Sequence, residues 1–165
     1  MSNGDGELRG IGGWLALFLV VMGVFSPLRV AVTLWSNLYE DPQVAAAYGA
    51  NWPTLELVEW IIAGLTVAGC WFVVGRMILV KNWTSVRIAI VGIWVLAIGT
   101  IFVELVAVSW IAGIPMEQLT AGIVLEIARP VFFCLIWTGY LMKSVRVANT
   151  YNRDGLAVEA AEVFQ

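Results

Sequence analysis

Residues 86–111 read VRIAIVGIWVLAIGTIFVELVAVSWI, and this stretch decides the fold class. A helix of about 20 apolar residues crosses the roughly 30 Å of hydrocarbon in a bilayer, and this stretch exceeds that length. Three similar stretches flank it, at residues 11–30, 55–80 and 119–145. The sequence therefore predicts an all-α, polytopic membrane protein, built as an antiparallel bundle of four transmembrane helices.

The composition of the whole chain agrees with a membrane location. Of the 165 residues, 61% are hydrophobic and 13% are charged, which is about half the charged fraction of a soluble domain. The net charge of −3 and the lack of a basic stripe argue against a nucleic-acid partner. The chain has no histidine, which excludes histidine-based triads and histidine metal sites. We expect no enzyme, cofactor or metal site.

Basic residues gather on one side of the predicted membrane. Positive charge near the ends of spans marks the cytoplasmic side. We therefore expect cytoplasmic tails at residues 1–10 and 149–165, a transmembrane domain at 11–148 and an outer loop at 31–54. Seven of the nine basic residues lie on the cytoplasmic side in this arrangement: Arg9, Arg76, Lys81, Arg87, Lys143, Arg146 and Arg153.

The outer loop carries the signature of a short helix. Asp41 is a typical N-cap residue, and Pro42 suits the first position of a helix. We expect a short helix from Gln43 to Tyr48, ended by Gly49. Within the spans, we expect the cysteines and tryptophans at mid-depth to act as packing residues or lipid-facing bulk: Cys70, Cys134, Trp71, Trp94 and Trp137.

Short motifs stand at both ends of the chain. The first is LRGIGGWL at residues 8–15 with SPLR at 26–29, and the second is IWTGYL at 136–141 with KSVRV at 143–147 and NTY at 149–151. Together these motifs resemble a bacterial family of small four-span inner-membrane proteins, the domain of unknown function 2569. The resemblance implies four spans, cytoplasmic ends and a bacterial inner-membrane location, and it supplies no activity. In that family a proline often stands where this chain has Gly139.

Apart from Arg76, Arg87 and Lys143, which lie near the cytoplasmic interface, six ionisable residues interrupt the apolar stretches. Each costs roughly 2.5–3.5 kcal/mol when it lies near the centre of a membrane helix. Because successive helices alternate in direction, all six fall in the outer half of the predicted bundle, which predicts an interhelical charge cluster open to the outside. The six are Arg29, Glu56, Glu59, Glu104, Glu126 and Arg129.

This charge cluster allows two interpretations. In the first, the chain is a binding or transport module in which Arg29 and Arg129 hold an anionic lipid headgroup or a small anion, with Glu59, Glu104 and Glu126 in the same site. In the second, the charges form a structural ion network in an accessory or scaffold subunit. The expected partners are membrane lipids, together with a second copy of the chain or a larger membrane complex.

Overall fold

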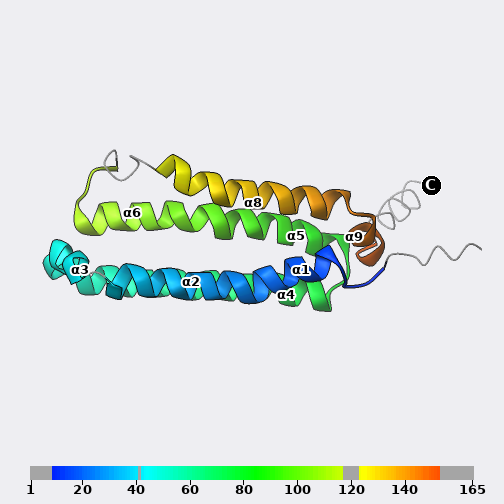
Figure 1. The fold of residues 1–165 in the computed structure, drawn as a ribbon, viewed down its shortest axis with the longest axis horizontal. Helices are drawn as coiled ribbons and strands as arrows, with labels where there is room; N and C mark the ends of the chain where they lie inside the picture. The colour runs from blue at the N-terminus through cyan, green and yellow to red at the C-terminus, as the bar shows by residue number, and fades with distance from the viewer. Residues whose placement is uncertain (1–8, 41, 117–122, 153–165) are drawn as a thin grey trace, which may run out of the picture.

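The computed structural model describes residues 9–40, 42–116 and 123–152, and every regular element in these ranges is helical. Figure 1 shows the long helices lying side by side along one axis. The first rod is continuous and consists of α1 (Trp14–Val20), η1 (Val21–Phe25), α2 (Ser26–Trp35) and η2 (Ser36–Glu40). The chain then passes through the short helices α3 (Pro42–Tyr48) and η3 (Gly49–Asn51). The second rod is α4 (Trp52–Leu79).

The third rod returns antiparallel to α4 after a tight turn. Asn82 is the N-cap of the helix that follows, because its side chain accepts a hydrogen bond from the Ser85 N–H at 2.9 Å. This rod consists of α5 (Trp83–Trp94), η4 (Val95–Gly99) and α6 (Thr100–Ala112). The last two helices are α8 (Ile123–Lys143) and the short α9 (Val145–Thr150).

Three rods are long and apolar enough to cross a membrane: Trp14–Tyr39, Gly49–Leu79 and Trp83–Ala112. In the described residues, the predicted helical fold is confirmed, and helices apolar enough to cross a membrane lie at the first three predicted positions. The 21-residue α8 lies where the fourth span was predicted. The predicted start of that span, at residues 119–122, lies outside the described residues.

The two ends of the bundle differ in their number of positively charged residues, and we name them accordingly. We call the end at the α4–α5 turn the basic end, because most of the described cations gather there. The opposite end, which carries α3, is called the α3 end (Figure 1). The cations that lie at or near the basic end are Arg9, Arg76, Lys81, Arg87, Lys143 and Arg146.

The main hydrophobic core lies at the basic end. Its centre is Trp137, whose indole ring lies 5.0 Å from the Phe18 ring and 6.4 Å from the Trp14 ring, measured between centroids. These contacts fix the first rod against α8. Cys70 and Cys134 are buried within this core, as predicted. The core also includes Leu15, Met22, Val73, Met77, Val86, Ala89, Ile93, Leu141, Val147 and Tyr151.

The first rod extends beyond its predicted end at residue 30. The helix continues to Glu40, so residues 31–40, which were predicted as part of the outer loop, are helical. Leu34 and Leu38 explain the extension, because they are spaced one helical turn apart and are both buried. The predicted short helix is present as α3, which begins at Pro42. Its predicted N-cap, Asp41, lies outside the described residues.

Thr150 and Tyr151, at the start of the predicted C-terminal tail, are buried against the helices. Tyr151 is fully buried, and its hydroxyl donates a hydrogen bond to the Met77 carbonyl at 2.7 Å. The Gly10 N–H donates to the Thr150 hydroxyl at 2.9 Å. Ser144 caps α9 by accepting from the Val147 N–H at 3.4 Å. A capped helix and a large buried ring therefore bring residues 149–151 into the folded domain, and Gly10 with them.

Candidate functional site

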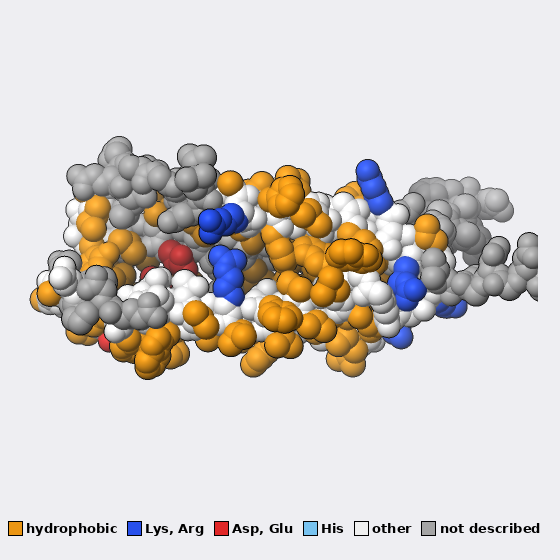
Figure 2. All heavy atoms as spheres, in the orientation of Figure 1, with side chains coloured by type: hydrophobic (Ala, Val, Ile, Leu, Met, Phe, Trp, Pro, Cys, Tyr) orange, Lys and Arg blue, Asp and Glu red, His pale blue; other side chains and the backbone are white. Residues whose placement is uncertain are grey.

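A cavity of about 490 Å³ lies between the rods, next to the hydrophobic core around Trp137 and toward the α3 end. This volume is within the range of small-molecule sites, roughly 300–1,000 Å³. The wall is formed by α2, α4, the η4–α6 segment and α8. Figure 2 shows blue and red side chains meeting at a hollow on one side of the molecule. The cavity therefore opens on the side of the bundle.

The packing of the helices explains where this cavity forms. The first rod lies along α4, whereas α8 lies on α5 and η4. The aromatic contacts of Trp137 hold the first rod and α8 together at the basic end. Beyond that cluster, α2 and α8 line opposite walls, with Arg29 and Arg129 between them. Because α4 also packs along α5 and α6, the cavity is the space left between the first rod and α8, which contact each other near the basic end.

Three π-helical segments contribute to the lining. Phe25 comes from η1, Asn37 from η2 and Leu96 from η4. A π-segment interrupts the regular hydrogen-bond ladder of an α-helix, and such segments are frequent at functional sites. Nothing in the sequence analysis predicted them, because the apolar pattern of these stretches reads as an uninterrupted helix.

Hydroxyl side chains line the middle of the cavity. The Thr66 hydroxyl donates to the Ile62 carbonyl at 2.7 Å, and the Thr100 hydroxyl donates to the Leu96 carbonyl at 2.9 Å. Each hydroxyl proton is therefore satisfied by its own helix, which leaves oxygen lone pairs to accept hydrogen bonds from the cavity. The presence of threonine within otherwise apolar spans was a signal for this wall that the sequence analysis did not use.

Four of the five predicted site residues line this one cavity: Arg29, Glu59, Glu104 and Arg129. They come from four different segments, α2, α4, α6 and α8, which are far apart in the sequence. The backbone of the fifth, Glu126, belongs to α8, but its side chain lies outside the described part of the structure.

The sixth charge of the predicted cluster, Glu56, lies outside the cavity lining. Its carboxylate accepts a hydrogen bond from the Tyr39 hydroxyl at 2.7 Å. This contact joins the end of the first rod to the start of α4. The structure therefore separates Glu56 from the four charges that share the cavity, although Glu56 and Glu59 lie on the same helix.

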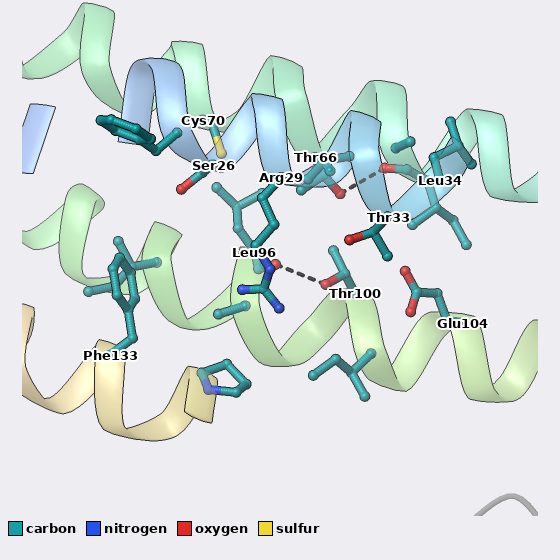
Figure 3. A pocket seen from close by; sticks show the side chains of 18 of the residues that line it. Ser26, Arg29, Thr33, Leu34, Thr66, Cys70, Leu96, Thr100, Glu104 and Phe133 are labelled. Carbon is teal, nitrogen blue, oxygen red and sulfur yellow. Dashed lines mark hydrogen bonds between the residues drawn. The ribbon is translucent and has the colours of Figure 1, made fainter. Parts of the chain in front are cut away.

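The chemical character of the lining side chains changes along the length of the cavity. Phe133 and Cys70 lie at the end nearer the basic end, and Glu104 lies at the other (Figure 3). Between them, the Arg29 side chain reaches across from α2 toward Leu96 and Thr100. From the basic end outward, the order is an apolar floor, then arginine and hydroxyl groups, then carboxylates. The apolar floor consists of Val21, Met22, Phe25, Cys70, Ile93 and Phe133.

The two arginines have exposed side chains, and the two carboxylates are half-buried. Among the described side chains, neither Arg29 nor Arg129 forms an ion pair or a hydrogen bond. A guanidinium carries five N–H donors in a planar fork that matches a carboxylate or a phosphate. Chemically, the pair can therefore hold an oxyanion between α2 and α8.

Comparison with known proteins identifies the family of the chain. Residues 8–152 match the model of the family described as "Protein of unknown function (DUF2569)". No curated protein and no solved structure matches the chain. The matched region contains all the described residues that line the cavity. The chain therefore belongs to the DUF2569 family of proteins of unknown function.

Proposed function

We propose that this protein is a four-span protein of the bacterial inner membrane that binds an anionic group in the cavity between α2 and α8. The group belongs to a lipid headgroup or to a small anion. The observation that carries the proposal is the convergence of Arg29 and Arg129, from two different helices, on one cavity. Figure 3 shows the Arg29 guanidinium inside the pocket, and Arg129 is part of the same lining.

The proposed topology places both termini in the cytoplasm. Three rods are apolar enough to cross a membrane, and the 21-residue α8 serves as the fourth span. The basic end carries most of the described cations, which marks the cytoplasmic side by the positive-inside rule. With this orientation, the cavity lies in the outer half of the bundle and opens sideways toward the outer leaflet.

The energetics of charge in a membrane favour a bound anion. An arginine near the centre of a membrane helix costs roughly 2.5–3.5 kcal/mol on an insertion scale. Charge-assisted hydrogen bonds to an oxyanion are about twice as strong as neutral ones. An anion held by Arg29 and Arg129 therefore offsets the cost of both cations. It also bridges α2 and α8 where they are not packed together.

Native mass spectrometry from a mild detergent tests the proposal. The comparison uses wild type, Arg129→Ala and, as a matched control, Arg87→Ala, which removes an exposed arginine on α5 outside this cavity. We expect wild type and the control to retain a non-protein mass that Arg129→Ala loses. Equal retention by all three proteins, or none by any of them, would contradict the proposal. Retention of no mass by any of the three proteins would favour an accessory subunit with a structural ion network.

A further inference from the structure

Among the described residues, the charges that line the cavity are balanced and are ordered along its axis. Arg29 and Arg129 contribute two positive charges, and Glu59 and Glu104 contribute two carboxylates. On the third rod, Glu104 lies one helical turn, about 6 Å, beyond Thr100. Figure 3 shows the Arg29 guanidinium near Thr100 and the Glu104 carboxylate on the next turn toward the α3 end. Along the cavity, a positively charged group is thus followed by a carboxylate.

A simple anion matches only part of this lining. It would use the arginines, but it would leave the apolar floor unfilled and would face the carboxylates of Glu59 and Glu104. Like charges at close range destabilise a complex, and carboxylates are poor neighbours for an oxyanion. A ligand that carries a chain, an anion and a cation in that order would match all three zones.

We infer that the cavity binds a zwitterionic phospholipid of the outer leaflet, with its phosphate between Arg29 and Arg129 and its ammonium group at Glu59 and Glu104. This inference rests on the proposed function and names the ligand class. An ethanolamine phosphate places its ammonium two carbons away from a phosphate ester oxygen, a separation comparable with one helical turn. The primary ammonium donates hydrogen bonds, which the carboxylates accept.

The length and direction of the cavity agree with a lipid. Along the first rod the lining runs from Val21 to Asn37, about 24 Å at 1.5 Å per residue. One leaflet with its headgroups is roughly 20 Å thick, half of a whole bilayer. In the proposed topology the apolar floor lies toward the bilayer centre. A lipid of the outer leaflet therefore enters sideways, without reversing its direction.

The test compares two lipids with identical acyl chains, phosphatidylethanolamine and phosphatidylglycerol. Each is titrated into the full chain, freed of co-purified lipid, and binding is measured by native mass spectrometry. We expect wild type to bind phosphatidylethanolamine about tenfold more tightly, equivalent to one lost charge-assisted contact. The double variant Glu59→Gln/Glu104→Gln should bind the two lipids within about twofold of each other. The matched control Glu56→Gln, altered on α4 outside the cavity, should keep the wild-type preference.

The outcomes separate this inference from the proposed function. Wild type could bind both lipids equally and Arg29→Gln/Arg129→Gln could bind neither. That result would overturn the binding of the ammonium group by Glu59 and Glu104, but it would still support the anion site. Binding of either lipid that does not depend on the arginines would overturn both. Competition by soluble glycerophosphoethanolamine as strong as that by the whole lipid would overturn the role of the apolar floor. The wild-type comparison needs no variant, so a variant that fails to fold does not block the test.

Discussion

The two ends of the bundle are packed in opposite ways. At the basic end, Trp137 and Tyr151 are buried in a continuous core. Toward the α3 end, no residue of α6 is buried, and a cavity of about 490 Å³ lies between the rods. The basic end is packed around one large apolar core, whereas the α3 end combines a few buried leucines, such as Leu34 and Leu38, with charged side chains around an open space. This difference indicates that stability and binding depend on different halves of the molecule.

The largest effect on stability is expected from Trp137→Ala. The side chain is 7% exposed and contacts four other aromatic rings, so truncation leaves a large gap in the core. We expect the free energy of unfolding to fall by about 3–5 kcal/mol. Unfolding by SDS in mixed micelles, followed by circular dichroism, measures this change. Trp110→Ala is the control, because Trp110 is 86% exposed, and a comparable loss there would contradict the assignment of the core.

The close approach of α4 and α5 gives the next largest effect. A Cβ at Gly92 would lie 2.7 Å from Val73 Cγ2, and a β-branched side chain in a helix has little freedom to move. Gly92→Ala should therefore destabilise the protein by about 1–3 kcal/mol in the same assay. A Cβ at Gly75 would meet no atom within 4 Å. Gly75→Ala should be neutral or stabilising by up to about 1 kcal/mol, and equal losses in both variants would count against the packing.

Tyr151→Phe should have a smaller effect at the basic end. The Tyr151 hydroxyl binds the Met77 carbonyl, one of the last carbonyls of α4, which has no partner within its helix. Leaving that carbonyl unsatisfied should cost about 1–2 kcal/mol. The same unfolding assay at neutral pH measures the loss. No measurable loss would show that water or another donor replaces the hydroxyl.

The same residue predicts a pH dependence. Burial raises the pKa of Tyr151 to about 12, from an ordinary value of 10.0. The unfolded chain loses this proton near pH 10, whereas the folded chain keeps it until near pH 12. The contribution of Tyr151 to stability is therefore complete below pH 10 and is lost as the pH rises toward 12. Wild type should lose more stability than Tyr151→Phe between these values, and parallel pH profiles would contradict the buried hydroxyl.

Much of the fold followed from apolar run length and from the residues that break helices. The start of α3 was readable because Pro42 stands at a first-turn position. The docking of Tyr151 was not readable, since a polar segment with one aromatic residue gives no local sign of its partner. That partner, Met77, lies 74 residues away.

The candidate site also has a part that the sequence predicted and a part that it did not. The four charged lining residues were predicted, because ionisable groups in apolar helices are rare and their depth follows from helix direction. The apolar floor was not predicted, because Phe25 and Phe133 look like any other membrane-facing residue. The π-segments that shape the lining depend on hydrogen-bond register, which the residue pattern does not encode.

The most direct test of the separation between the two halves is the stability of Arg29→Gln/Arg129→Gln. Wild type and the variant, both freed of lipid, are unfolded in the same assay, and their retention of lipid is measured in parallel. Separate roles for the two halves predict free energies of unfolding within about 0.5 kcal/mol of each other, together with loss of lipid binding by the variant. A loss of about 3–5 kcal/mol with unchanged lipid binding would contradict it, because removing half of a structural ion network has that effect.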